Sequence, residues 1–122
     1  MTKRILVVED QEDNRQILRD LLSSAGFEII EAETGEEALV AASSQRPDLI
    51  LMDIQLPVLD GYEVTRRIKA NPLLQEIPII VVTSYALSGD EGKAREAGCN
   101  DYVTKPYSPR ELLAKIRNLL SR

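Results

Sequence analysis

Three carboxylates follow two apolar runs of the sequence and are the first candidates for chemistry. Glu9 and Asp10 come directly after residues 5–8, and Asp53 comes directly after residues 49–52. If both runs are neighbouring parallel strands, their carboxyl ends meet at one edge of a sheet and bring the three side chains together. A divalent cation with oxygen ligands relieves the repulsion between such carboxylates. The pattern therefore predicts a Mg²⁺ site, whereas an acidic pair on its own more simply indicates a helix cap.

A hydroxyl group and an amine complete the candidate site. Thr83 ends the apolar run 79–82, and Lys105 follows the mixed run 101–104. Taken singly, a threonine in a strand and a lysine in a loop need no functional explanation. At the same sheet edge as the carboxylates, they would bind the oxygens of a phosphoryl group. Asp53 is then the nucleophile that attacks phosphorus and forms an aspartyl phosphate.

The composition excludes several other kinds of chemistry. The 122 residues include no histidine and a single cysteine, Cys99. Catalysis by histidine, metal binding through histidine, CxxC redox chemistry and a disulfide framework are therefore excluded. Cys99 is expected to be a buried apolar side chain. The net charge of −5 argues against direct binding of nucleic acid. No apolar run is long enough for a signal peptide or a membrane span, so we expect a cytoplasmic protein.

Amphipathic stretches alternate with the apolar runs. The runs 5–8, 49–52 and 79–82 suit parallel strands that are covered on both faces, and the mixed runs 27–31 and 101–104 suit the edges of the sheet. The apolar stripes expected to face the core are Ile17, Leu18, Leu21 and Leu22; Ala38, Leu39 and Ala42; Val64 and Ile68; and Leu112, Leu113, Ile116, Leu119 and Leu120.

Capping signals mark where the helices begin and end. A capping residue followed three positions later by Glu or Gln is expected to begin each helix, at Asp13, Thr34, Asp60, Ser88 and Ser108. Gly89 and Gly92 weaken the helix that follows Ser88. The predicted fold is a single α/β domain over residues 1–122, a (βα)₅ doubly wound sheet of five parallel strands with the flavodoxin-like order 2-1-3-4-5.

Taken together, these motifs resemble the receiver (response-regulator) domains of two-component signalling, and the likeness extends over essentially the whole chain. The segments that carry it are ILVVED, which ends at Glu9 and Asp10; LILMDIQLPVLDG around Asp53, with Pro57 and Gly61; VVTS with Thr83; and DYVTKP with Lys105 and Pro106. The resemblance implies a switch in signalling that assists only its own phosphorylation and dephosphorylation and is otherwise not an enzyme.

The resemblance implies a phosphoacceptor and a set of metal ligands. Asp53 would accept the phosphoryl group. Mg²⁺ would be bound by Asp10, by Asp53 and by the backbone carbonyl of Gln55, and Glu9 would act through a water molecule.

It also implies how the phosphoryl group is held. Thr83 and Lys105 would bind its oxygens, together with the backbone amides of Ile54 and Ser84. The peptide bond between Lys105 and Pro106 is expected to be cis, which would place the lysine at the site.

Two further roles follow from the same resemblance. On phosphorylation, Thr83 would move towards the phosphoryl group and Tyr102 would turn into the space that it leaves. Gln55 and Tyr85, two residues after Asp53 and Thr83, would tune dephosphorylation, and a bulky Tyr85 would shield the phosphate from water.

The expected partners are proteins. The phosphoryl donor would be a phosphohistidine of a histidine kinase or histidine phosphotransfer protein. Residues 1–63 carry 14 acidic and 5 basic residues, whereas residues 64–122 carry 6 and 10. The more basic half predicts the output surface, formed by the helix after Ser88, the strand 101–104 and the last helix with Arg110, Lys115 and Arg117. Output through this surface would be either binding of a downstream protein or formation of a homodimer.

We expect a stand-alone, single-domain response regulator, and two alternatives to it remain open on the sequence. The chain could be a receiver cut from a longer DNA-binding or enzymatic regulator. It could instead be a metal-dependent phosphohydrolase, but that class needs a second acid–base carboxylate near the nucleophile, and the residue two positions after Asp53 is Gln55.

Overall fold

The computed structural model describes residues 2–83 and 90–121. In these residues five strands and five helices alternate along the chain. The strands are β1 (Arg4–Val8), β2 (Glu28–Ala32), β3 (Leu49–Asp53), β4 (Ile79–Thr83) and β5 (Asp101–Thr104). The helices are α1 (Glu12–Ser24), α2 (Gly35–Gln45), α3 (Gly61–Ala70), α4 (Asp90–Ala97) and α5 (Pro109–Leu120).

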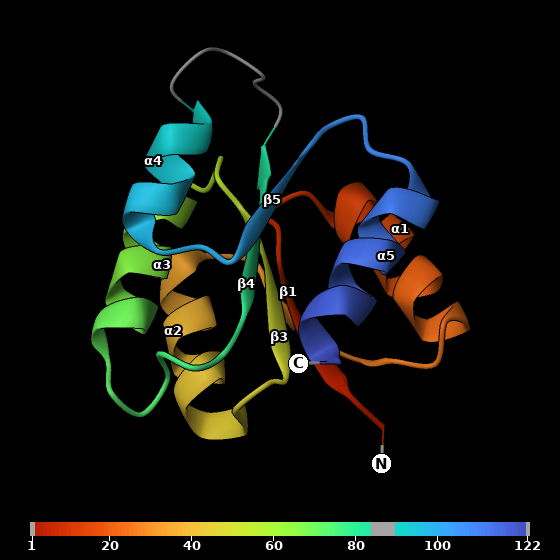
Figure 1. Ribbon diagram of the computed structural model, residues 1–122, viewed down its shortest axis with the longest axis horizontal. Helices are drawn as coiled ribbons and strands as arrows, with labels where there is room; N and C mark the ends of the chain where they lie inside the picture. Colours follow the sequence, from red (N-terminus) through yellow and green to blue (C-terminus); the bar gives the residue numbers. More distant parts are fainter. Residues whose placement is uncertain (1, 84–89, 122) are drawn as a thin grey trace.

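The strands form one parallel sheet in the order β2-β1-β3-β4-β5, as predicted. The mixed strands β2 and β5 lie at the edges, and the three apolar strands lie between them. Helices α1 and α5 cover one face of the sheet, and α2, α3 and α4 cover the other (Figure 1). The strand order reverses between β1 and β3, so the loops that follow these two strands diverge and leave a place for a ligand between them.

Alternate residues of the central strands supply two separate cores. Ile5 and Val7 of β1 face the core shared with α1 and α5, whereas Leu6 and Val8 face the core shared with α2 and α3. Because both faces are covered, the strand has no polar side and its sequence is an unbroken apolar run. This arrangement holds the carboxyl ends of β1, β3 and β4 in fixed positions.

Three of the predicted helix caps are confirmed. The side chains of Thr34, Asp60 and Ser108 accept hydrogen bonds from the backbone N–H three residues later. The cap predicted at Asp13 is wrong, because α1 begins at Glu12, with Gln11 as its N-cap residue and no side-chain cap bond. Ser88 lies outside the described residues.

One predicted core position is also wrong. Ile17 was expected to face the core, but it is 62% exposed, whereas its neighbour Leu18 is buried. The inward face of α1 is formed by residues 15, 18 and 22, a spacing that leaves Ile17 at its margin. Arg15 occupies the first of these inward positions, which gives α1 a buried charge.

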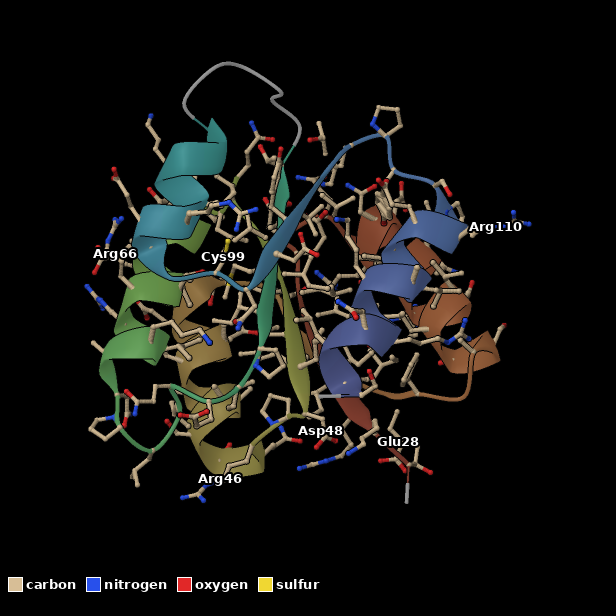
Figure 2. All side chains as sticks on the ribbon, viewed as in Figure 1. Glu28, Arg46, Asp48, Arg66, Cys99 and Arg110 are labelled. Atoms are coloured by element: carbon tan, nitrogen blue, oxygen red, sulfur yellow. The ribbon has the colours of Figure 1, made fainter. Side chains whose placement is uncertain are left out.

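Several charged side chains lie at the surface, and the single cysteine of the chain lies against the core. Arg46, Arg66 and Arg110 extend outwards from the fold, whereas Cys99 packs against the core on the α3–α4 side (Figure 2). Cys99 is half-buried, so the expectation of a buried side chain is met only in part, and burial raises the pKa of its thiol. In the part of the chain that the structure describes, no helix has the length and apolar character needed to cross a membrane.

Candidate functional site

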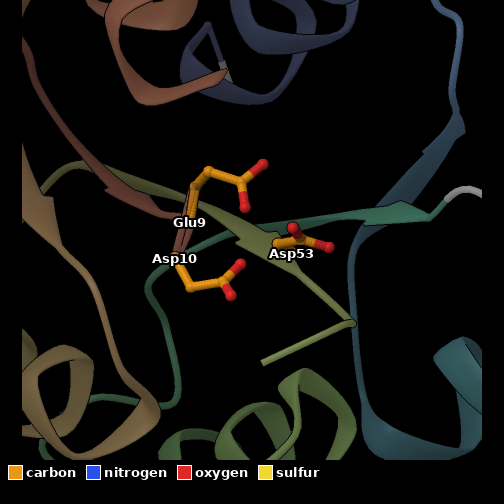
Figure 3. Close-up of side chains that lie close together, drawn as sticks. All are labelled: Glu9, Asp10 and Asp53. Carbon is orange, nitrogen blue, oxygen red and sulfur yellow. The ribbon is translucent and has the colours of Figure 1, made fainter. Parts of the chain in front are cut away.

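The three predicted carboxylates meet at the carboxyl ends of β1 and β3. Glu9, Asp10 and Asp53 each place a carboxylate oxygen within 4.8 Å of the other two (Figure 3). Glu9 is 2% exposed and Asp53 is 5% exposed, whereas Asp10 is half-buried and open to solvent. The cluster therefore has two carboxylates inside the protein and one at its mouth.

Backbone hydrogen bonds fix the ends of both strands. The Glu9 N–H donates to the Ala32 carbonyl at 3.1 Å, which extends the pairing of β1 with β2 by one residue. The Ile54 N–H donates to the Val82 carbonyl at 3.1 Å, which does the same for β3 and β4. The acidic residues thus project from backbone that the sheet itself holds in place.

Gly61 allows the loop after β3 to fold back against the phosphoacceptor candidate. A Cβ atom at this position would lie 2.2 Å from the backbone oxygen of Asp53 and 2.9 Å from Cα of Ile54. The Gly61 N–H donates to the Ile54 carbonyl at 3.1 Å. The glycine is required here by a close approach of backbone to backbone.

Lys105 is the cation of the site. Its Nζ donates to Oε1 of Glu9 at 3.1 Å and to Oδ2 of Asp53 at 3.5 Å. Burial acts to lower the pKa of this amine, but the negative charges of Asp53 and Glu9 outweigh it and raise the pKa above its usual value. Lys105 therefore remains an ammonium group and offsets part of the charge of the cluster.

The pKa of Glu9 is also raised. The main cause is burial, which disfavours the ionised form, and the neighbouring Asp53 adds to it. Lys105 opposes both effects and limits the shift. Glu9 and Asp53 thus share one ammonium group, which leaves the cluster short of positive charge.

Thr83 and Tyr102 lie where the sequence placed them, at the end of β4 and within β5. Thr83 is buried, and its carbonyl accepts a hydrogen bond from the Lys105 N–H at 2.7 Å. Tyr102 is half-buried and packs against the core on the α3–α4 side. Their predicted exchange of positions on phosphorylation stays a prediction.

The structure describes the backbone amides of Gln55 and Ile54, of which only that of Ile54 was predicted to bind a phosphoryl oxygen, and one peptide bond confirms an expectation. The Gln55 N–H donates to Oδ1 of Asp53 at 3.1 Å, whereas the Ile54 N–H is engaged by the Val82 carbonyl. The predicted bond from Ile54 to a phosphoryl oxygen would require that amide to leave its partner. The peptide bond between Lys105 and Pro106 is cis, as expected. Ser84 and Tyr85 lie outside the described residues.

A cavity of about 500 Å³ opens beside the acidic cluster. It lies between α1 and the segment that links β5 to α5, and Glu9, Asp53 and Lys105 contribute to its wall. Most of its lining is apolar, and Leu18 and Tyr107 are part of it. The buried side of the site is therefore reached through an apolar cavity.

The sequence reasoning missed two residues at this site. Tyr107 lines the cavity, and burial raises the pKa of its hydroxyl. Arg15 is buried and donates through Nη1 to the Glu9 carbonyl at 2.9 Å. A signal for Arg15 was present, because its spacing from Leu18 and Leu22 puts it on the apolar face of α1.

The residues present fit a magnesium ion. The donors are carboxylate oxygens, which Mg²⁺ prefers, and one of the three is open to solvent, as suits an ion that retains water ligands. Asp10 and Asp53 would hold the ion, with the Gln55 carbonyl and a water on Glu9 as predicted further ligands. In chemical terms the site offers a carboxylate nucleophile, an ammonium group and a place for a divalent cation.

Comparison with known proteins gives one consistent family. Residues 5–117 match the family described as response regulator receiver domain. The polar-differentiation response regulator DivK of Brucella ovis is 45% identical over 120 residues, which cover 98% of each chain.

Solved structures agree with this match. The receiver domain of a sensor histidine kinase from Pseudomonas aeruginosa, solved with a magnesium ion coordinated in its active-site cleft, has a TM-score of 0.93 and 38% identity, with complete coverage of both chains. The chemotaxis response regulator CheY4 of Vibrio cholerae has a TM-score of 0.91 and 27% identity, covering 98% of this chain and 99% of that one.

Proposed function

Because the chain belongs to the response regulator receiver domain family, we propose that it is a signalling switch in which Asp53 accepts a phosphoryl group with the help of Mg²⁺. The observation that carries this proposal is the cluster of Glu9, Asp10 and Asp53 within 4.8 Å of one another, with Lys105 bonded to two of them. The magnesium ion reported for the Pseudomonas aeruginosa receiver domain supports the same reading of the acidic cluster.

The side chains around Asp53 are suited to nucleophilic attack. Oδ1 of Asp53 accepts the Gln55 N–H at 3.1 Å, which orients the carboxylate. Oδ2 faces Lys105 at 3.5 Å, a contact long enough to be exchanged for a phosphoryl oxygen. Bound Mg²⁺ would supply positive charge to the carboxylates and to the transferred group. Lys105 and Thr83 would stabilise the remaining phosphoryl oxygens.

The phosphoryl donor lies outside these 122 residues. An oxygen of Asp53 forms a bond to phosphorus while the bond from phosphorus to a donor imidazole nitrogen breaks, and the imidazole leaves with the electron pair of that bond. Since these residues contain no histidine, the donor imidazole belongs to another part of the signalling system, and a histidine kinase or a histidine phosphotransfer protein has the right chemistry. The apolar cavity beside Asp53 and Lys105 would admit the flat ring of the donor.

The output surface of the switch is formed by α4, β5 and α5. Lys115 of α5 donates to Asp101 of β5 at 3.2 Å, which joins these two elements. Arg110 and Arg117 are exposed on α5 and give this face its basic character. Phosphorylation of Asp53 would change the position of Thr83 and Tyr102, and so the surface that a downstream protein or a second copy of the chain binds.

The proposal is tested by phosphorylating the protein with a small donor. Incubation with acetyl phosphate and MgCl₂ should add one phosphoryl mass to the intact protein, and chelation of Mg²⁺ should abolish the addition. The Asp53→Asn variant should show no acid-labile, hydroxylamine-sensitive phosphate.

Asp20→Asn is the matched control, because Asp20 is an exposed aspartate on α1 away from the cluster. This variant should be phosphorylated as the wild type is. Phosphorylation of the Asp53→Asn variant at the wild-type rate would show that another residue is the acceptor.

A further inference from the structure

A buried arginine on α1 contacts the turn that carries Glu9 and Asp10. Arg15 is 5% exposed, and within the described ranges it is the one buried basic residue. A charge removed from water in this way requires partners that compensate for its lost hydration. The contacts of Arg15 therefore indicate what this buried charge does for the fold and for the site.

The guanidinium group joins three segments. Nη1 donates to the Glu9 carbonyl at 2.9 Å. Nη2 donates to Glu33 at 2.9 Å and also to Glu12 in the first turn of α1, and Nε donates to Glu31 of β2 at 3.3 Å. Arg15 thus connects the β1–α1 turn, the start of α1 and the end of β2.

The bond from Arg15 and a backbone hydrogen bond together hold the β1–α1 turn at Glu9. The Glu9 N–H donates to the Ala32 carbonyl at 3.1 Å, so that both backbone polar groups of Glu9 have partners. The Arg15 N–H also donates to the Gln11 carbonyl at 3.0 Å. The bond to Gln11 is a backbone bond of α1 that does not depend on the side chain at position 15, whereas the bond to the Glu9 carbonyl comes from the guanidinium group.

The charge of Arg15 is directed away from the acidic cluster. Its guanidinium is paired with Glu12, Glu31 and Glu33, none of which belongs to the cluster. The cluster carboxylates repel one another, and a turn free to move would separate them. By holding the turn, Arg15 lowers the cost of assembling these ligands around a cation.

We propose that Arg15 is a positioning residue that holds the β1–α1 turn so that Asp10, and Glu9 through a water molecule, can bind Mg²⁺, and so sets the affinity of the site for the ion. The inference rests on the proposed function, because it takes the acidic cluster to be the Mg²⁺ site. Mutation of a residue that orients metal ligands from outside the coordination shell commonly weakens metal binding by about 10–100-fold.

Arg15→Met is the test variant, because it keeps an apolar stem on the inward face of α1 and removes every donor. Titration with MgCl₂ in a calorimeter should give a dissociation constant raised by about tenfold. In phosphorylation by acetyl phosphate, the Mg²⁺ concentration for half-maximal rate should rise by the same factor. The rate at saturating Mg²⁺ should stay close to that of the wild type, because Asp53 and Lys105 are untouched.

Arg19→Met is the matched control. Arg19 lies one turn further along α1 and shares two partners with Arg15, with Nη1 at 2.8 Å from Glu31 and Nη2 at 3.5 Å from Glu12. Among the described residues it makes no hydrogen bond to the turn at 9–11. The same loss of charge and of ion pairs at Arg19 should leave the Mg²⁺ dissociation constant within about twofold of the wild type, a difference below 1 kcal/mol.

The outcomes separate this inference from the proposed function. Wild-type protein that binds no Mg²⁺ overturns both. Wild-type binding with an unchanged constant in Arg15→Met, or with equal changes in Arg15→Met and Arg19→Met, overturns the role of Arg15 alone. If Arg15→Met does not fold, Arg15→Lys decides, because the three N–H donors of an ammonium group start from one nitrogen and cannot replace the four bonds that the three guanidinium nitrogens make to the Glu9 carbonyl and to three carboxylates. A several-fold weakening supports the role of Arg15, and unchanged affinity overturns it.

Discussion

At the scale of single residues, the site has more negative charge than its one ammonium group can neutralise. Glu9 and Asp53 are buried and share the ammonium group of Lys105, and Asp10 adds a third carboxylate at the mouth. Burial raises the pKa of Glu9 despite that ammonium group. The carboxylates therefore repel one another, and a bound divalent cation would relieve this repulsion.

Asp10→Asn should therefore have opposite effects on stability and on metal binding. Without Mg²⁺ the variant should gain up to about 1 kcal/mol in free energy of unfolding, the Coulomb energy of two unit charges about 4 Å apart in water. Its affinity for Mg²⁺ should fall at least about tenfold. Urea denaturation at low ionic strength, with and without MgCl₂, measures both effects.

Asp20→Asn serves as the control for the loss of one negative charge, since Asp20 is exposed on α1. It should leave Mg²⁺ affinity unchanged. If Asp10→Asn instead destabilises the metal-free protein, then Asp10 supports the fold and the repulsion argument is wrong.

At the scale of elements, the backbone at the start of α3 packs closely against the backbone of Asp53, the phosphoacceptor candidate. Gly61 begins α3 at the point where the chain returns to the end of β3, and its N–H bonds the Ile54 carbonyl. Any side chain there would meet the backbone oxygen of Asp53. The position of Asp53 therefore depends on the absence of a side chain at one helix start.

Gly61→Ala and Gly92→Ala should change stability in opposite directions. The added Cβ at position 61 would lie 2.2 Å from the Asp53 carbonyl oxygen, and the forced shift should cost about 1–3 kcal/mol. A Cβ at Gly92 in α4 meets no atom within 4 Å, so the better helix propensity of alanine should add about 1 kcal/mol. Denaturant unfolding of the two variants measures both effects. Equal effects of the two changes would contradict the close-approach argument.

The helices and strands could be predicted, because hydrophobic periodicity and the residues that cap helices are local features of the sequence. The predicted strands and the observed ones differ by at most one residue at either end, and the apolar strands lie between the two mixed ones, as expected. The phase of α1 could not be predicted, because Ile17 and Leu18 are adjacent and only contact with the sheet decides which one turns inward. The φ of 68° at Val58 also leaves no signal, since valine is rare in that region.

The residues of the site could also be predicted, because they lie at the ends of strands that local patterns identify. Glu9 and Lys105 directly follow strands, and Asp53 and Thr83 are the last residues of strands, so the parallel topology alone brings all four to one edge. The pairing of Lys105 with two carboxylates depends on side-chain geometry, which the sequence does not encode locally. The role of Arg15 was missed because a basic residue on a helix is more often exposed.

At the scale of the whole molecule, the site joins β1 and β3, two adjacent inner strands of the sheet. Its carboxylates come from the ends of β1 and β3, which pair with each other and lie between the two cores. A ligand that binds both strand ends binds only the folded chain, because the unfolded chain does not hold these residues together. Cation binding is therefore coupled to the stability of the entire fold.

Mg²⁺ should accordingly stabilise the protein against unfolding. At a free concentration one hundred times the dissociation constant, the gain should be about 2.7 kcal/mol, provided that the unfolded chain does not bind the ion. The same series in NaCl of equal ionic strength separates binding from screening, because screening also weakens the repulsion within the acidic cluster. The Asp10→Asn variant should start from a more stable metal-free state and gain less from Mg²⁺. Equal stabilisation of the wild type by NaCl and MgCl₂ would mean that the cluster responds to ionic strength and binds no ion specifically.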